Sequence, residues 1–164
     1  MPQHTVFGSM KQYEKGGVQV IDANPKHYVF SNVFEIASTS KPYEKVAVAK
    51  NLKYVIEALR AEGTSPWFTA AHDESVLVMD GEVDIHLVKL EREAVAANKE
   101  GSVKITGEPR GKKMGTISAR RGHMALLPKG AAYQFRASTL GVLLMQTLQG
   151  DHTVEKWAAI CQTT

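Results

Sequence analysis

The run His72-Asp73-Glu74, an imidazole followed by two carboxylates, is the densest group of side chains able to do chemistry. Imidazoles and carboxylates bind metal ions and transfer protons, so the run predicts a metal site or acid–base chemistry. Adjacent residues of a strand point to opposite faces, which argues against a catalytic pair of His72 with Asp73. Any site here must therefore use residues from other segments.

Two other histidines, His86 and His123, lie on later segments of the chain. Together with His72 they form a conceivable rearranged metal site, which would need all three to converge. The alternative, which we favour, is that the three are surface or hydrogen-bonded residues. The lone Cys161 cannot form an internal disulfide and is expected to be a buried or inert thiol.

The segments around this run have the pattern of β-strands. Residues 76–79 are an apolar run that Asp80-Gly81 ends, and apolar and polar residues then alternate over 82–90. This pattern predicts a buried strand, a hairpin turn and a half-exposed strand, with Gly81 at positive φ. Further strands are predicted at 45–49, 53–61, 103–106, 114–118, 122–130, 132–137 and 140–148. Residues 53–61 contain good helix formers, but the turn chemistry around them favours a strand.

Three segments are predicted to make up the chain. Residues 1–43 form an N-terminal arm, 44–150 a barrel with a charged insertion at about 91–115, and 151–164 a short C-terminal helix. Residues 91–100 are compatible with a helix. Asp151 or Thr153 can cap the C-terminal helix, and Glu155 suits its positive end.

The N-terminal arm contains an apolar stretch, 28–36, that predicts an edge strand or an arm laid on a partner. Such a stretch needs a cover, and Trp67-Phe68 adds apolar surface that exceeds what a solitary barrel needs. The aromatic side chains expected to contact a partner are Tyr28, Phe30, Phe34, Trp67 and Phe68.

Composition excludes some classes of function. The net charge of +3 is small, and the basic residues between 89 and 121 are not interleaved with aromatic ones, so nucleic-acid binding is not expected. No apolar run has the length of a membrane span, and the N-terminus does not resemble a signal peptide. The expected protein is a single cytoplasmic domain of 164 residues with an all-β sandwich or barrel.

Two glycine frames extend this prediction. Glu74 and Gly81 are separated by six residues, and Gly122, Pro128 and Gly130 follow in the second frame. In spacing and order the frames resemble the two motifs of the cupin superfamily, and the similar region covers about residues 63–148. The resemblance implies a double-stranded β-helix, that is, a jelly-roll barrel.

The metal ligands of the cupin pattern are missing. The resemblance places Phe68 and Ala70, or alternatively Trp67 and Thr69, where two histidines stand in metal-binding cupins, and Tyr133 where the third stands. Of four ligands only Glu74 is left, and a single carboxylate does not offset the dehydration of a divalent ion. We therefore expect a degenerate metal site without a cofactor, in which Glu74 and Tyr133 form a hydrogen-bonded pair or, less favoured, a weak acid–base pair.

A narrower resemblance involves residues 53–74, the size of the chain and its apolar arm. Together they resemble the small subunit of two-component hydroquinone 1,2-dioxygenases, the ring-cleaving enzymes of 4-nitrophenol and 4-hydroxyacetophenone degradation. The resemblance implies that Fe(II) belongs to a larger cupin subunit, which converts hydroquinone and O2 to 4-hydroxymuconic semialdehyde. This chain would be an inactive subunit of a hetero-oligomer.

Two alternatives have to be weighed against this subunit. The first is a metal-free cupin enzyme such as an epimerase or isomerase that works with a His–Asp pair and a tyrosine. The second is a module that binds a small aromatic or sugar ligand in an open barrel. A barrel plugged by Trp67, Phe68 and Tyr133 would favour the subunit.

Overall fold

The computed structural model describes residues 8–13 and 32–160. Ten strands dominate this part of the chain, which confirms the all-β prediction. The strands are β1 (Lys45–Asn51), β2 (Tyr54–Thr64), β3 (Trp67–Thr69), β4 (Glu74–Asp80), β5 (Glu82–Leu90), β6 (Val103–Ile105), β7 (Gly111–Arg120), β8 (Met124–Leu127), β9 (Ala131–Leu148) and β10 (Thr153–Val154). The helices are α1 (Val33–Thr39) and α2 (Trp157–Ile160).

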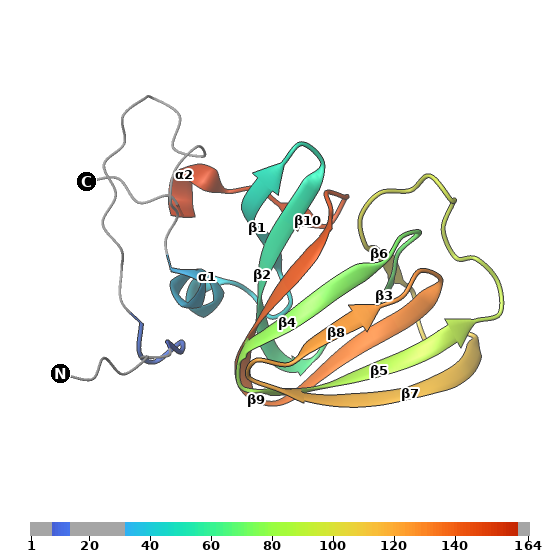
Figure 1. Cartoon of the computed structure of the whole chain (residues 1–164), viewed down its shortest axis with the longest axis horizontal. Coiled ribbons are helices and arrows are strands. Elements are labelled where there is room, and N and C mark those ends of the chain that lie inside the picture. Colours follow the sequence, from blue (N-terminus) through green and yellow to red (C-terminus); the bar gives the residue numbers. More distant parts are fainter. Residues whose placement is uncertain (1–7, 14–31, 161–164) are drawn as a thin grey trace.

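The strands form one continuous sheet that β9 folds into two layers (Figure 1). The first half of β9 pairs with β5 and β3, and its second half pairs with β4 and β2. One layer therefore runs β10-β1-β2-β9-β4-β8, and the other runs β7-β5-β9-β3-β6. All pairs are antiparallel except β1 with β10, as in a jelly-roll barrel.

The main core lies between the two layers. The inward-facing side chains of both layers meet there, as the alternation in β5 predicts. Its largest fully buried members include Tyr133, Phe135, Leu59, Ile85 and Met145.

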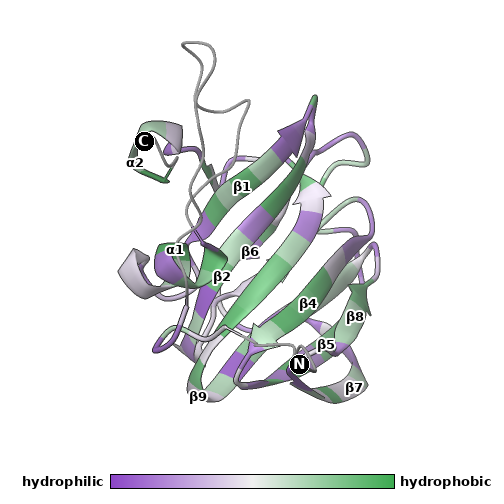
Figure 2. Ribbon diagram, turned by 60° about the vertical axis from the view of Figure 1, so that its left-hand side comes forward, coloured by the Kyte–Doolittle hydropathy of each residue, from purple (hydrophilic) through white to green (hydrophobic). Residues whose placement is uncertain are grey.

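The helices cover part of the outer face of the first layer, where α1 lies next to β2 (Figure 2). Ile36 and Ile160 pack there against Val46 and Ala58. These apolar contacts attach α1 and α2 to the barrel. No helix in residues 8–13 and 32–160 is long and apolar enough to cross a membrane.

Of the two alternatives predicted for 28–36, an edge strand or an arm laid on a partner, the edge strand is wrong for residues 33–36. Residues 33–39 form the helix α1. The Asn32 side chain caps this helix by accepting from the backbone N–H of Phe34 at 3.0 Å, a signal that the aromatic composition obscured. Tyr28 and Phe30 lie outside the described residues.

The C-terminal helix is present but shorter than expected. Thr153 lies in β10 and donates its hydroxyl to Glu57 Oε1 at 2.6 Å, so it caps no helix. Glu155 pairs with Lys50 at 2.7 Å across the sheet. These tertiary contacts override the local amphipathic pattern.

The strands β4 and β5 and their neighbours are confirmed, including β2, where propensity favoured a helix. The hairpin predicted between β4 and β5 is wrong, because these strands pair with successive parts of β9 and Gly81 is a corner between the two layers. Two boundaries differ. Residues 91–102 form bends and turns without a helix, and β7 already begins at Gly111, inside the predicted insertion. The separate strands predicted at 132–137 and 140–148 are one strand, β9, which passes from one layer to the other.

Gly81 offers a test of the corner between β4 and β5. It has φ +77°, and an added Cβ would lie 2.8 Å from the Gly141 Cα. We expect Gly81→Ala to lower the free energy of unfolding by about 2 kcal/mol or more, because the residue needs a left-handed conformation and the neighbouring backbone cannot move away. Gly107→Ala is the matched control, with φ +74° and nothing within 4 Å of the added Cβ. Urea unfolding measures both, and equal losses would contradict the role of the close contact.

Candidate functional site

The interior positions of the barrel are set by the pairing of β3 with β9. Phe68 lies opposite Tyr133, with the ring centroids 6.0 Å apart, so both side chains enter the same interior. Trp67 and Thr69 alternate with Phe68 and point to the other side of the strand, where the Thr69 hydroxyl donates to the Ala131 carbonyl. The interior register is therefore that of Phe68 and the buried Ala70.

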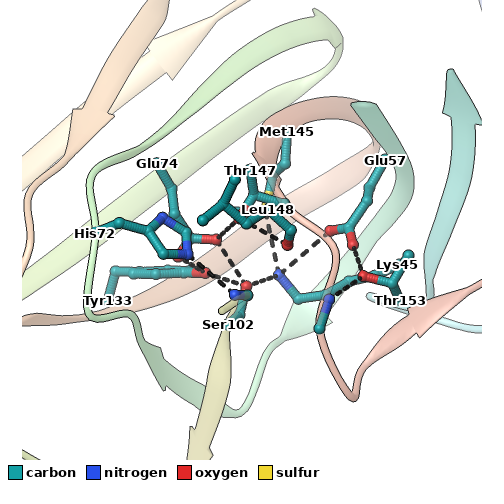
Figure 3. A network of polar contacts seen from close by, with 12 residues as sticks. Lys45, Glu57, His72, Glu74, Ser102, Tyr133, Met145, Thr147, Leu148 and Thr153 are labelled. Atoms are coloured by element: carbon teal, nitrogen blue, oxygen red, sulfur yellow. Dashed lines mark hydrogen bonds and ion pairs between the residues drawn. The ribbon is translucent and has the colours of Figure 1, made fainter. Parts of the chain in front are cut away.

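Glu74 begins β4 and points into the same space (Figure 3). Its Oε1 accepts from the Tyr133 hydroxyl at 2.9 Å, and its Oε2 accepts from Ser102 at 2.8 Å and from Thr147 at 2.7 Å. The pair of Glu74 and Tyr133 expected from the sequence is present within a larger network. Hydroxyl donors reach both oxygens of this buried carboxylate, which is what a buried charge needs to be stable.

Lys45, which no sequence pattern indicated as a site residue, enters this network from β1 (Figure 3). The side chain is 2% exposed. Its Nζ donates to Ser102 Oγ at 3.0 Å and to Met145 Sδ at 3.3 Å, and lies 4.6 Å from the Phe68 ring centroid. No signal near Lys45 could have revealed this, because a lysine that begins a strand is usually exposed.

Glu57 is a second buried carboxylate on the opposite side of Lys45. The Lys45 Nζ and Glu57 Oε2 are 3.9 Å apart, and the Thr153 hydroxyl donates to Oε1. Burial raises the pKa of Glu57, while Lys45 and the hydrogen bond from Thr153 counteract the rise. Because the pKa of Glu57 is still raised overall, desolvation of the carboxyl has a larger effect on it than Lys45 and Thr153 have.

The Tyr133 hydroxyl acts as a hydrogen-bond donor. Burial, followed by the nearby Glu74, raises its pKa well above the ordinary value for tyrosine. The phenol therefore stays protonated at neutral pH and does not serve as a base there. Glu74 and Tyr133 fill space and satisfy one another, which disfavours the acid–base interpretation.

The His72-Asp73 pair considered for a metal-free enzyme does not form. His72 Nε2 accepts from the Gly101 N–H at 3.0 Å, and its Nδ1 lies 3.0 Å from the backbone carbonyl of Asp73. The Asp73 carboxylate instead accepts from the Lys129 N–H at 2.8 Å. Both side chains stabilise loops.

The other two histidines make separate contacts. His86 Nδ1 lies 3.2 Å from the Thr116 hydroxyl, and His123 Nδ1 accepts from the Arg120 N–H at 2.9 Å. Across the described ranges, no three residues of the types His, Cys, Asp and Glu are grouped so that they could hold a metal ion.

A metal ion, which the barrel type implies, does not fit the side chains at the ligand positions. Phe68 and Ala70 have no donor atom, and Tyr133 is engaged as a donor to the one carboxylate. The Lys45 ammonium also lies among these groups and would repel a cation.

The structure changes the expectation for the aromatic partner residues. Phe34, Trp67 and Phe68 are all less than 10% exposed within this chain. Phe34 packs against Ala37 and Val142, and Phe68 belongs to the main core. Most of their apolar surface is thus covered within this chain, and their contact with a partner stays a prediction.

A shallow pocket of about 410 Å³ opens on the outer face of the first layer, near the β1–β2 turn. Its wall includes Tyr54, His72, Leu126, Gln146 and Leu148. It lies outside the barrel interior.

These observations define the class of protein. Two layers of a jelly roll share β9, and Gly81, Gly122 and Gly130 at positive φ end the strands of the two glycine frames. The chain is a cupin with a plugged interior and without the imidazoles of the metal-binding members.

Comparison with solved structures gives the family. A chain of the hydroquinone 1,2-dioxygenase PnpCD, in complex with Cd2+ and 4-hydroxybenzonitrile, is 52% identical over 99% of this chain and 98% of that chain, with a TM-score of 0.92. A chain of the hydroquinone 1,2-dioxygenase from Sphingomonas sp. TTNP3, with 4-hydroxybenzoate bound, is 55% identical over 99% of both chains, with a TM-score of 0.93. The protein therefore belongs to the hydroquinone 1,2-dioxygenase family, as the sequence resemblance indicated.

A second kind of chain matches in fold. A PnpCD structure with Fe3+ contains a chain that is 12% identical, with a TM-score of 0.59, over 81% of this chain and only 36% of that longer one. No protein-family model and no curated protein matches the chain.

Removal of the Tyr133 hydroxyl tests the interior network. We expect Tyr133→Phe to lower the free energy of unfolding by about 1–3 kcal/mol, because Glu74 Oε1 loses its donor in a buried site. The control Tyr54→Phe, at a tyrosine that is 54% exposed, should change it by less than about 0.5 kcal/mol. Denaturant unfolding measures both, and an unchanged Tyr133→Phe variant would show that the bond adds nothing.

Glu57 predicts a pH dependence of stability. Its pKa is raised in the folded state, so the folded protein binds more protons than the unfolded one between the unfolded value, about 4.3, and the folded pKa. Its contribution to stability therefore falls as pH rises through this interval. In Glu57→Gln that contribution is absent, so the free energy of unfolding of the wild type minus that of the variant should decrease from pH 4 upward. A constant difference would contradict the raised pKa.

Proposed function

We propose that this chain is the non-catalytic small subunit of a heteromeric, Fe(II)-dependent hydroquinone 1,2-dioxygenase of the cytoplasm. The enzyme would convert hydroquinone and O2 to 4-hydroxymuconic semialdehyde, with the iron in a larger cupin subunit that this chain stabilises. The observation that carries the proposal is the match at 52–55% identity over 99% of the chain to chains of such enzymes.

The two kinds of matching chain support a larger cupin partner. PnpCD contains a chain similar to this one over nearly its whole length, and also a longer chain of the same fold but low identity. The enzyme from Sphingomonas sp. TTNP3 likewise has a longer chain, 16% identical with a TM-score of 0.55. We infer that this chain pairs with a longer cupin chain in the same way.

The interior of the barrel supports placing iron in the partner. Ring cleavage needs iron with positions open to substrate and O2, and non-haem Fe(II) is held by imidazoles and a carboxylate. The corresponding space here holds Phe68, Tyr133 and the Lys45 side chain. A division of labour between the chains explains why this plugged interior is compatible with the enzyme family.

The outer face of the first layer offers a surface for the partner. Cross-strand pairing places Leu126, Ser75, Gln146 and Ile56 in one row. We call this surface the open face; its apolar members are Tyr54, Ile56, Leu77, Met124, Leu126 and Leu148. Met124 is 69% exposed and Leu126 58% exposed, whereas α1 and α2 cover the neighbouring part of the layer. An apolar sheet face of this kind, next to a shallow pocket, is typical of a subunit interface.

Reconstitution tests the subunit role. The chain should show no ring cleavage of hydroquinone with Fe(II) by itself, and activity should require the larger chain encoded in the same host. Oxygen uptake and the absorbance of the semialdehyde measure the reaction. Full activity of the isolated chain, or full activity of the larger chain without it, would contradict the proposal.

Charge substitutions test the open face. Met124→Glu combined with Leu126→Glu should leave the chain folded, since both side chains are exposed, but should reduce capture of the larger chain by at least about 100-fold. Met114→Glu, at a methionine on β7 in the other layer that is 49% exposed, is the control and should not affect capture. Loss in the control as well, or in neither variant, would place the interface elsewhere.

A further inference from the structure

The internal cation of the barrel is the subject of one further inference. In metal-binding cupins the ion lies between the ligand positions, which correspond here to Phe68, Glu74 and Tyr133. We propose that the Lys45 ammonium takes the place of the metal ion in this chain, so that the fold keeps a central positive charge without binding a metal. The inference deepens the proposed function, because a chain with its own cation does not compete with the larger subunit for iron.

The position of the ammonium carries the proposal. Lys45 Nζ lies 4.6 Å from the Phe68 ring centroid and 5.9 Å from the Tyr133 ring centroid. Its acceptor Ser102 Oγ in turn contacts both other groups, at 2.8 Å from Glu74 Oε2 and 3.2 Å from the Tyr133 hydroxyl. The amine thus lies next to the Phe68 and Tyr133 rings and reaches Glu74 through Ser102.

The Lys45 ammonium has neighbours of several chemical types, as a metal ion has in its coordination shell. Ser102 provides an oxygen, Met145 a sulfur, Glu57 a carboxylate at 3.9 Å, and the Phe68 ring a π-face. Ring faces attract cations, and the attraction is stronger where water is excluded. A phenyl ring at the position of an imidazole therefore attracts an ammonium, whereas it offers no donor atom to a metal ion.

The charges around the ammonium explain why it is tolerated in the core. Lys45 is 2% exposed and Glu57 is 1% exposed. An isolated buried amine is costly, whereas one between two buried carboxylates, Glu57 and Glu74, has compensating charges. Removal of the amine would leave both carboxylates without a cation.

The strand that carries Lys45 determines which segments the amine connects. Lys45 comes from β1, and Ser102 comes from the loop before β6, 57 residues later. An internal cation on a side chain can tie β1 to the insertion and to the second half of β9, where Met145 lies. The amine thereby connects the part of the chain that holds α1 to the barrel.

Thermal unfolding of the full chain at pH 8 is the first test. Lys45→Met should lower the Tm by about 10 °C, because it breaks a buried ion pair but keeps the length of the side chain. Lys50→Met is the matched control, on the same strand with a half-exposed partner, Glu155, and should lower the Tm by about 2 °C or less. Glu57→Gln added to Lys45→Met should recover about half of the loss.

Two results of this test would overturn the proposal. One is an equal loss in Lys45→Met and Lys50→Met. The other is a further loss when Glu57→Gln is added, since that would show that Lys45 does not compensate the Glu57 charge.

Rebuilding of the metal site is the second test, with Co2+ as the probe. The variants are Phe68→His with Tyr133→His, which keeps Lys45, and the same pair together with Lys45→Ala. Two imidazoles and Glu74 form a ligand set for a divalent ion. We expect about 1 mM Co2+ to raise the Tm by several degrees, and to give visible absorption, only in the variant without Lys45. By linkage, this difference corresponds to Co2+ binding at least about 100-fold tighter than in the variant that keeps Lys45.

The outcomes of the second test are distinct from those of the subunit test. Equal cobalt binding with and without Lys45 would overturn the proposal, and so would no binding by either folded variant. Where the Lys45→Ala combination does not fold, the Lys45→Met series decides. None of these measurements involves ring cleavage, so a negative result leaves the subunit role unaffected.

Discussion

The buried polar network around Lys45 and Glu74 is the interaction on which the rest of the structure depends. Lys45 comes from β1, Glu74 from β4, Tyr133 and Thr147 from β9, and Ser102 from the loop before β6. Polar groups without water are stable only when nearly all of them are paired, so the network requires these strands in one arrangement. The same requirement leaves no open position at the centre of the barrel.

This constraint explains how a cupin barrel can belong to a dioxygenase family and yet lack a metal site within the described residues. In a metal-binding member, one ion draws the ligands of several strands together. Here hydroxyl donors, a carboxylate and aromatic rings make the corresponding contacts with each other and with an amine. The fold thus keeps a central cross-link that is made of side chains.

The outer face of the first layer has one half that helices cover and one half that is exposed. The helices α1 and α2 cover Val46 and Ala58, and beyond them apolar side chains such as Met124 and Leu126 remain exposed. Trp67 and Phe68, which the sequence pointed to as contact residues, are buried in this chain. Hydrophobicity alone does not separate buried from exposed positions, because the side of the strand decides which of the two a residue occupies.

The amino-acid sequence by itself determined the local features. Alternation over residues 82–90 predicted β5, and Asp80-Gly81 predicted a break with Gly81 at positive φ; both are present because strand period and turn chemistry depend on neighbouring residues. That this break is a corner between two layers and not a hairpin depends on the pairing of β4 and β5 with β9. The missing imidazoles could likewise be identified from position alone. Only the tertiary structure decided that Lys45 enters the barrel, that Ser102 bridges it to Glu74, and that residues 33–39 form a helix. Lys45 meets Ser102 across 57 residues and Met145 across 100, and no local pattern specifies contacts between side chains so far apart in the chain.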